Sequence, residues 1–309
     1  MPVDTLEAAA GRLAALLKGE STELSEPSGR SDLELAADVA VRPLARAATA
    51  PADVWAVDGG QCLVADARCV QLLVTRAARV RYREGVCALE DDGELTATVV
   101  VPGGAVDVNL LRDRGEWQAV ARCVAEGDPG ALVLIDGDLQ PDWRMPSSEL
   151  ATLLGEAAAR GVVLVGVTKH SSLARGGAPL LGWLEREAER RFGERAMWWA
   201  PLGRTRSDVG GFQVLAARLD PDARFSFRVD VPLGVDAEPV LAALSALCDD
   251  AAFPGYPYPL SVADRLAACP GWLRAELRHR LDELFDEAGV PFEVRERAFA
   301  DRHDLMERA

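Results

Sequence analysis

The sequence predicts an α/β protein built on a mixed sheet, and three observations lead to that prediction. Short apolar runs separated by turn residues follow one another after residue 51, which indicates an antiparallel meander. Two later apolar runs, residues 131–136 and 162–169, flank a stretch with helical periodicity, which indicates a strand–helix–strand unit. The 309-residue chain is 49% hydrophobic, so it can bury a core of the size that this architecture needs.

The elements of this sheet can be assigned in chain order. The expected elements are strands at 53–58, 61–66, 69–82 and 94–101, a helix at about 108–126, a strand at 131–136, a helix at 147–161 and a strand at 162–169. The segments DGG, DAR and EDDGE supply turns between the first four strands, and a serine cap and a glycine stop bound the second helix. An antiparallel meander followed by parallel strands, with helices on the faces of the sheet, is the ribonuclease H-like plan.

Helical additions are expected at both ends of the chain. Four leucines near helical spacing predict an amphipathic helix over residues 4–18, a polar linker follows at 19–31, and a second helix broken at Pro43 is expected over 32–48. We therefore divide the chain into an N-terminal helical arm with linker, residues 1–50, and a main domain, residues 51–309. The tail is expected to contain a strand at 224–232 and a helix at 237–250. Residues 253–267 are expected to begin with a turn that leads into a further helix, and a long amphipathic helix is expected at 271–289.

Composition narrows the class of protein. The net charge of −15 argues against a broadly basic surface for nucleic acid, although it leaves room for a local channel or for metal ions that neutralise phosphate. No stretch approaches 18 uncharged apolar residues and no apolar segment follows Met1, so we expect a cytoplasmic protein with no membrane span. The six cysteines form no CxxC pair, which favours buried thiols over a zinc site.

Two apolar strands end in the same way, with an aspartate followed by a glycine. Asp58 ends one strand and Asp136 the other, and Glu116 lies on the helix between them with a spacing that could face the sheet. Carboxylates at strand ends gather at one edge of a mixed sheet, where they repel one another unless a divalent cation lies between them. Two Mg²⁺ or Mn²⁺ ions roughly 3.5–4 Å apart would activate a water for phosphodiester cleavage. Alternatively each Asp-Gly is simply a turn, and the spacing leaves both interpretations open.

The stretch GYPYPLSVADRLA, residues 255–267, resembles the C-terminal signature of the NurA nuclease family. The other motifs also follow the order of that family, and they are Asp58, Glu116, Asp136, Lys169 in GVTKHS, and then Tyr256 and Tyr258. The resemblance covers about residues 51–270. It implies a ribonuclease H-like fold and a Mn²⁺-dependent nuclease that acts on DNA ends and single strands. It also implies a toroidal homodimer that works with the hexameric HerA ATPase in end resection.

One position departs from the pattern of that family. Many members carry a histidine eight residues after the first tyrosine, and this chain has Asp264 there. An aspartate is a good ligand for Mn²⁺ or Mg²⁺, because both are hard ions. It is less suited than histidine to transferring a proton at neutral pH. The resemblance therefore supports a metal-ligand role for Asp264 more than a general-base role.

The predicted function is a metal-dependent deoxyribonuclease that acts with a HerA-type translocase. The candidate catalytic residues and metal ligands are Asp58, Glu116, Asp136 and Asp264, and the candidate substrate-binding residues are Lys169, Tyr256 and Tyr258. The last three also have simpler explanations, since a tyrosine in a proline-rich turn often only packs and a lysine at a strand end is often a solvated charge. The leucine face of residues 4–18 and the helix at 271–289 predict a homodimer.

Two rival functions and one surface feature complete the sequence-based picture. An actin- or hexokinase-like ATPase or phosphotransferase shares the core fold, but it usually needs a duplicated half and a Gly-rich adenosine motif, and the sequence has neither. A non-catalytic partner would use the fold only to dock on a translocase, and the retained carboxylates speak against it.

Arg79, Arg81 and Arg83 share one face of a strand, and this face would either line a DNA channel or be solvated.

Overall fold

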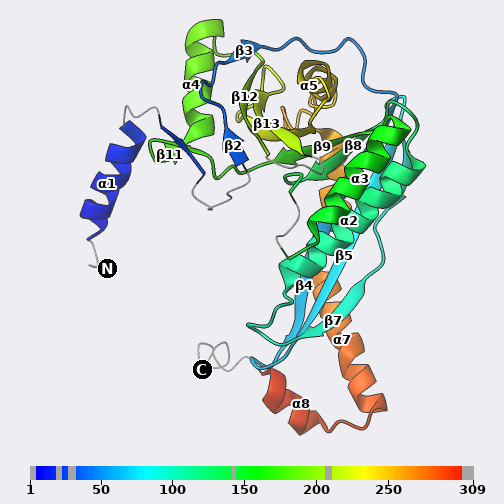
Figure 1. The fold of residues 1–309 in the computed structure, drawn as a ribbon. Helices are drawn as coiled ribbons and strands as arrows, with labels where there is room; N and C mark the ends of the chain where they lie inside the picture. The colour runs from blue at the N-terminus through cyan, green and yellow to red at the C-terminus, as the bar shows by residue number, and fades with distance from the viewer. Residues whose placement is uncertain (1–4, 19–22, 27–32, 141–143, 206–210, 301–309) are drawn as a thin grey trace.

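The structure is a computed structural model that describes residues 5–18, 23–26, 33–140, 144–205 and 211–300 (Figure 1). Most of the linker expected at 19–31 lies outside these ranges. The main feature of the structure is a large mixed sheet with helices on both faces. A long hairpin extends from this sheet, and two C-terminal helices lie near the far end of that hairpin (Figure 1).

The described residues form eleven strands of the large sheet and three strands of a small one. In spatial order the main path of the large sheet is β2 (Leu33–Leu35), β12 (Trp198–Thr205), β13 (Phe212–Arg218), β14 (Phe227–Pro232), β9 (Val163–Thr168), β8 (Leu132–Asp136), β4 (Asp53–Asp66), β5 (Gln71–Arg83) and β6 (Val86–Asp91), with β3 (Arg42–Pro43) beside β12 and β7 (Thr96–Val100) beside β5. The small sheet contains β1 (Leu24–Ser25), β10 (Ala174–Arg175) and β11 (Ala178–Pro179). The pairs β4–β8 and β8–β9 are parallel, and the other pairs are antiparallel. The ribonuclease H-like plan is therefore confirmed.

The helices lie on both faces of the large sheet and at the two ends of the chain. They are α1 (Leu6–Lys18), α2 (Val108–Glu126), α3 (Ser147–Arg160), α4 (Leu180–Phe192), α5 (Ala237–Ser245), α6 (Tyr258–Ala267), α7 (Gly271–Glu287) and α8 (Phe292–Phe299). No helix among the described residues has both the length and the apolar character that a membrane crossing requires.

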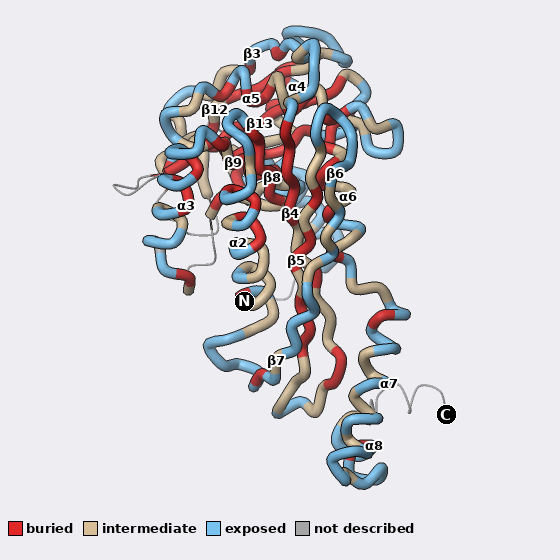
Figure 2. The backbone as a smooth tube through the Cα atoms, turned by 90° about the vertical axis from the view of Figure 1, so that its right-hand side faces the viewer, coloured by how far each residue is buried: buried red, intermediate tan, exposed pale blue. Residues whose placement is uncertain are grey.

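Alternation along β4 separates two cores. Trp55 and Val57 face a core shared with α2, α3 and α4, whereas Val54 and Ala56 face a core shared with α5 and α6. All four residues are at most 1% exposed, and burying each larger apolar side chain contributes about 1.5–3 kcal/mol. Figure 2 shows buried residues concentrated along β4, β8 and β9, whereas α7 and α8 are largely exposed.

Several expected elements are confirmed, and one expected helix is wrong. The helices at 108–126 and 147–161 and the strands at 131–136 and 162–169 are present as α2, α3, β8 and β9. The helix expected over 32–48 is wrong, because β2 and β3 occupy that segment and pair with β12. The strands β6, β12 and β13 and the helix α4 were not expected. The division of the chain at residue 51 stays a prediction.

The turn expected at DGG is also wrong. β4 continues without interruption from Asp53 to Asp66 and pairs with β5 through Asp58, Gly59 and Gly60. The two glycines serve close approach instead. A Cβ added at Gly59 would overlap the carboxylate of Glu116 on α2, and a Cβ added at Gly60 would overlap the carbonyl oxygen of Ala267 at the end of α6. Glycine is needed here because two helices approach the backbone of β4 from opposite faces.

We predict that Gly60→Ala destabilises the protein, because the atom in the way is a backbone carbonyl that cannot move without shifting α6. The free energy of unfolding should fall by about 1–3 kcal/mol, as in other overpacked sites, and chemical denaturation measures it. The matched control is Gly182→Ala within α4, where an added Cβ meets nothing within 4 Å. That control should be neutral or slightly stabilising, and equal stability of the two variants would contradict the prediction.

Candidate metal centre

The register of the two parallel strands brings Asp58 and Asp136 together. Val57 on β4 pairs with Ile135 on β8, so the aspartates that follow them lie at adjacent positions of neighbouring strands. Both have the same parity as residues that face the core under α5 and α6, such as Ala56 and Leu134. The two carboxylates therefore leave the sheet on the α6 side.

Asp264 reaches the same place from α6. Gly255 has a φ of 92° and packs so tightly against Ala223 that a Cβ would overlap it, so this turn requires glycine. Pro257 then caps α6 and Pro259 lies in its first turn, where the missing N–H of proline leaves no bond unmade. The helix runs along β4 until Ala267 meets Gly60, and this path places Asp264 beside Asp58 and Asp136.

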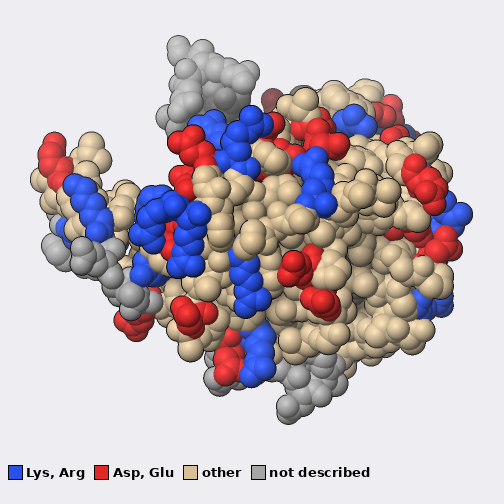
Figure 3. Space-filling view, turned by 90° about the horizontal axis from the view of Figure 1, so that it is seen from above, with Lys and Arg blue, Asp and Glu red and all other residues tan. Residues whose placement is uncertain are grey.

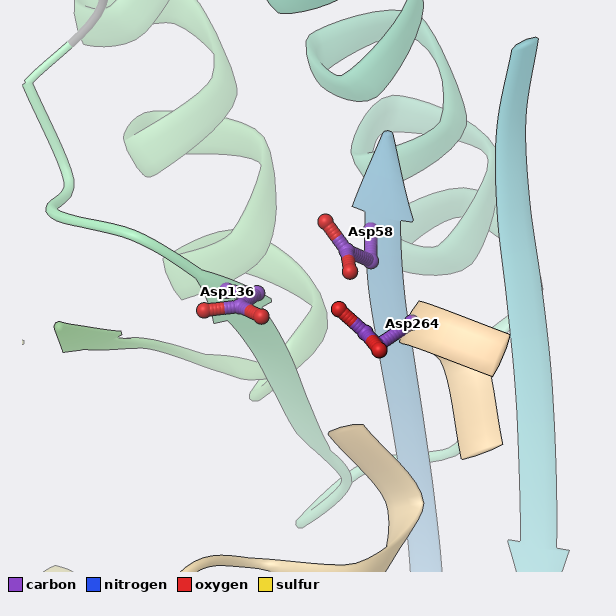
Figure 4. A group of neighbouring side chains, drawn as sticks. All are labelled: Asp58, Asp136 and Asp264. Atoms are coloured by element: carbon purple, nitrogen blue, oxygen red, sulfur yellow. The ribbon is translucent and has the colours of Figure 1, made fainter. Parts of the chain in front are cut away.

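Asp58, Asp136 and Asp264 form a group in which one carboxylate oxygen from each lies within 4.8 Å of the others. Figure 4 shows the three side chains converging from β4, from the end of β8 and from α6. Asp136 is 11% exposed at its side chain and Asp264 is 60% exposed, so the group opens to solvent on the side of α6. The structure thus brings together three of the four carboxylates that the sequence suggested.

Glu116 lies on the other face of β4. Its carboxylate lies where a side chain at Gly59 would be. Gly59 and Asp58 are successive residues of β4 and therefore face opposite sides of the sheet. Arg112 pairs with it through Nε, 3.1 Å from Oε1, and the side chain of Glu116 is 12% exposed. Burial raises the pKa of Glu116 to about 8; Arg112 opposes the shift, while Asp113, Asp58 and Asp136 add to it. Glu116 is therefore electrostatically linked to the aspartates without being one of the converging group.

The pKa of Asp58 is raised by burial and by repulsion from the other aspartates. Burial and the negative charge of Asp136 raise the pKa of Asp58 to about 7, and Asp264 adds to this effect. The N–H of Gly59, which donates to Asp58 Oδ1 over 2.7 Å, and the charge of Lys169 act in the opposite direction. A buried aspartate that holds its proton up to neutral pH is in an environment that favours a bound cation.

Lys169 places its ammonium group among these carboxylates. Its Nζ donates to Asp136 Oδ2 over 2.6 Å, lies 3.7 Å from Asp264 Oδ1 and stands 5.0 Å above the centre of the Tyr256 ring. Burial disfavours the charge of Lys169, but the hydrogen bond with Asp136 and the nearby aspartates raise its pKa overall. The lysine follows β9, whose Val167 pairs with Asp136, and this position explains how a side chain 33 residues away reaches the group.

The two tyrosines of the turn occupy different environments. Tyr256 is 2% exposed, its ring packs on Phe227 and Phe253, and its hydroxyl has no hydrogen-bond partner among the described residues. Burial and the charges of Asp136, Asp58 and Asp264 raise the pKa of Tyr256, so the hydroxyl keeps its proton as a donor. Tyr258 instead packs its ring edge-on against Tyr82, with centroids 5.0 Å apart. Its position suits packing of α6 on β5.

The sequence analysis missed a buried ion pair that supports the end of β8. Arg228 and Asp230 on β14 are 4% and 0% exposed and bind each other through two hydrogen bonds of 2.8 and 2.9 Å. Asp230 also accepts the N–H of Leu139 over 3.1 Å, and Arg228 lies 3.6 Å from Asp138. The pair therefore fixes the loop that follows Asp136. Two charges at alternate positions of an apolar strand were the signal for it.

The arginines of β5 do not form an open channel face. Arg79 binds Asp91 and Glu126, Arg81 binds Asp53, and Arg83 binds Asp128. Arg79 and Arg81 also stack on the ring of Trp55, at 5.6 and 4.7 Å from its centre. Both side chains are only 14% exposed, so they tie β5 to its neighbours and to the loop after α2.

Comparison with solved structures identifies the fold. No protein-family model matches the chain, and no curated protein matches it in sequence. The NurA nuclease from Sulfolobus solfataricus superposes with a TM-score of 0.62 at 15% identity, over 92% of this chain and 95% of that one. The chain has the fold of the NurA nucleases. Two further NurA structures, one of them with manganese, each give a TM-score of 0.55 at 8% and 10% identity; the first covers 83% of this chain and 92% of its own, the second 91% and 97%.

The donor set of this centre suits a divalent metal ion. All three ligand atoms are carboxylate oxygens, which Mg²⁺ and Mn²⁺ prefer. Bonds of about 2.1 Å to one ion bring opposite ligand oxygens to about 4.2 Å, so a spread within 4.8 Å needs only small side-chain rotations. Three negative charges with one lysine leave the group in need of further positive charge. Asp58, Asp136 and Asp264 would hold the ion.

We predict that the metal-free protein loses stability as pH rises from about 4 to about 8. The pKa values of Asp58 and Glu116, about 7 and about 8, lie above their ordinary values of 3.8 and 4.5. The unfolded chain therefore releases these protons first, and the folded state pays an increasing penalty until pH exceeds the folded pKa values. Asp58→Asn should raise the melting temperature in EDTA by a few degrees at pH 8 and by nothing near pH 4.

The control for this prediction is Glu156→Gln on α3, an exposed carboxylate that should leave the melting temperature unchanged at either pH. Differential scanning fluorimetry between pH 4 and pH 8 makes the measurement. A wild-type protein that is equally stable at both pH values, with no gain from Asp58→Asn, would show that the three aspartates do not repel one another.

Proposed function

We propose that this protein is a metal-dependent nuclease that hydrolyses phosphodiester bonds in DNA. The observation that carries the proposal is the convergence of Asp58, Asp136 and Asp264 from three separate elements of a NurA-like fold. Manganese is present in one of the similar NurA structures, which supports Mn²⁺ as one of the ions and leaves Mg²⁺ as the alternative. DNA as the substrate, a pair of ions and the cytoplasm as the compartment belong to the same proposal.

The proposed roles follow from position and charge. Asp58, Asp136 and Asp264 hold the metal, and Glu116 adds negative charge from the far face of β4 when it is deprotonated. When bound, the ions supply Lewis-acid stabilisation of phosphate charge and lower the pKa of a water. Lys169 is close enough to the cluster to bind a phosphate oxygen when the aspartates are occupied by metal. The buried hydroxyl of Tyr256 keeps its proton and is available to donate a hydrogen bond to a bound phosphate. A DNA-binding role for Tyr258 is the weakest part of this set, because its ring packs on Tyr82.

The proposed function includes assembly. The helix α1 has no buried residue, and Leu6, Leu13, Leu16 and Leu17 are between 45% and 82% exposed. Four exposed leucines on one short helix favour a covering partner, and a second copy of the chain is the partner we propose. A HerA-type hexameric translocase is proposed as the motor that supplies DNA, since a chain of net charge −15 does not attract DNA over a distance.

The function is tested by incubating single- and double-stranded DNA with the protein in Mn²⁺, in Mg²⁺ and in EDTA. We predict cleavage with at least one of the two ions and none in EDTA. Asp58→Asn should abolish cleavage while leaving the fold intact, because the side chain keeps its shape and loses its charge. Glu156→Gln serves again as the control. Activity in EDTA, or full activity in Asp58→Asn, would refute the proposal, and ATP hydrolysis by the protein alone would favour the phosphotransferase alternative.

A separate prediction concerns Asp264, which is exposed and therefore the easiest ligand to replace. Asp264→Ala should raise the Mn²⁺ concentration that gives half-maximal cleavage on the order of tenfold, and excess Mn²⁺ should partly restore the rate, because a ligand contributes mainly to metal affinity. Asp222→Ala is a matched control with similar exposure, 64% against 60%. An unchanged metal titration would mean that Asp264 is a surface residue of α6 and that Asp58 and Asp136 hold the ion without it.

A further inference from the structure

A groove at the far end of the β4–β5 hairpin has no role in the site described above. It has a volume of about 1050 Å³ and lies between the hairpin turn at residues 63–69, the start of α7 and the end of α8. The hairpin and the two helices form the lower end of the molecule in Figure 1. The groove is open to solvent, and its position beyond the metal centre on the same strand suggests a relation between the two.

Most of the charged residues that line this groove are arginines. Arg68, Arg274, Arg278 and Arg297 contribute to it, with Asp66 as the single acidic residue. Arg274 and Arg297 are exposed, and neither guanidinium group makes an ion pair or hydrogen bond with any residue that the structure describes. Arg278 lies 3.5 Å from Asp282 and Arg68 lies 3.8 Å from Asp66, distances longer than a charge-assisted hydrogen bond. The groove is therefore electropositive within a strongly acidic chain.

The arrangement on α7 is regular. Gly271, Arg274, Ala275 and Arg278 follow the i, i+3, i+4, i+7 spacing that places residues on one face of a helix, and all four line the groove. The small residues leave space beside the two guanidinium groups. The helix begins after Pro270, which offers no side-chain cap, so no side chain of the cap residue satisfies its first N–H groups.

The hairpin turn adds a fourth arginine from an unusual backbone position. Arg68 has a φ of 68°, in the left-handed region that a non-glycine residue rarely adopts, and the N–H of Cys69 donates to the carbonyl of Ala67 in the same turn. A long cationic side chain at a position that suits glycine points to a requirement for that side chain. We assign that requirement to the groove, because Arg68 contributes a positive charge to its lining.

The charge on the opposite end of the molecule is distributed differently. Figure 3 views the protein from the end that carries α4 and α5, and its basic side chains occur in small groups flanked by acidic ones. No continuous basic tract crosses the described residues of that face. The groove thus differs from the surface in having several arginines with a single carboxylate among them.

We propose that this groove binds the phosphate backbone of the nucleic-acid strand whose reacting bond lies at the metal centre. The inference rests on the proposed nuclease function. β4 carries both sites, since Asp58 belongs to the metal centre and Leu63 to Asp66 line the groove. Five to eight residues of strand span about 17–26 Å, and one strand of a duplex advances about 3.4 Å per nucleotide. The groove therefore contacts phosphates about five to eight nucleotides from the cleaved bond.

A second copy of this chain fits the groove less well than a nucleic acid does. A two-fold interface that packed this groove against the same groove of a second copy would bring arginines against arginines. Phosphates match an array of arginines directly, because each guanidinium donates two parallel hydrogen bonds to one phosphate. Binding along a strand also uses several cations at once, as the groove provides.

The test compares a groove variant, Arg274→Ala with Arg297→Ala, with a control variant, Arg190→Ala with Arg195→Ala. Both change the net charge equally, and the control side chains are 75% and 72% exposed and lie outside the groove. Binding of a fluorescent 20-nucleotide single strand to the full-length protein is measured by anisotropy in EDTA, so that no cleavage is needed. The dissociation constant is followed from 50 to 200 mM salt, and the molar mass of each variant is measured by light scattering.

The groove variant should bind on the order of tenfold more weakly than the wild type, with the slope of log K against log salt reduced in magnitude by about 1.4, or 0.7 for each lost phosphate contact. The control should match the wild type. With metal, the groove variant should cleave a dinucleotide as the wild type does and cleave the 20-mer less well, because only the longer strand reaches the groove.

Equal affinity and slope in all three proteins, or no measurable binding by the wild type, would overturn the proposal. A groove variant that changes molar mass would assign the groove to an interface between copies instead. Failure of cleavage with binding intact would count against the nuclease function alone.

Discussion

The contact between α6 and β4 at Gly60 is the constraint on which the rest of the site depends. The carbonyl of Ala267 lies where any side chain at residue 60 would be, and Arg76 holds the same carbonyl with a hydrogen bond of 3.0 Å from its Nε. The helix can therefore lie directly on the backbone of the strand. Because Asp264 is one turn before Ala267, this contact also sets the distance from Asp264 to Asp58 and Asp136. Gly59 plays the corresponding part on the other face, where it admits Glu116.

Electrostatic repulsion is the consequence of that close packing. Three aspartates, one glutamate and one lysine lie around the middle of β4 and the end of β8, and the raised pKa values of Asp58 and Glu116 reflect the cost of placing them there. A protein selected for stability alone would not gather these charges. The buried pair of Arg228 and Asp230 strengthens the same conclusion, because it fixes the loop that follows Asp136 and so keeps one member of the group in position.

The sequence was sufficient for the type of sheet and for the two neighbouring aspartates, although Asp58 lies within β4 and only Asp136 ends its strand. Apolar runs of β8 and β9 and the periodicity of α2 and α3 carry strong local signals, and parallel pairing then places Asp58 beside Asp136. It was misleading at DGG, because glycine promotes turns in general and only the packing of α2 and α6 reveals its use here. It also failed for residues 32–48, where the helical propensity of an alanine-rich segment is overridden by pairing with β12. The separation of Glu116 from the three aspartates follows from the parity of β4, which becomes informative once the strand is known to be continuous through Gly59.

The central claim is that Asp58, Asp136 and Asp264 together bind a divalent ion, and a crystal structure of the protein grown with Mn²⁺ tests it most directly. Anomalous scattering locates manganese without reference to activity, DNA or partners. The account predicts an anomalous peak within about 2.1 Å of a carboxylate oxygen from each of the three aspartates, with the Lys169 ammonium displaced from its present position beside Asp136. A protein that binds no manganese at this place, or that binds it away from these three residues while Lys169 keeps its contact with Asp136, would contradict the account.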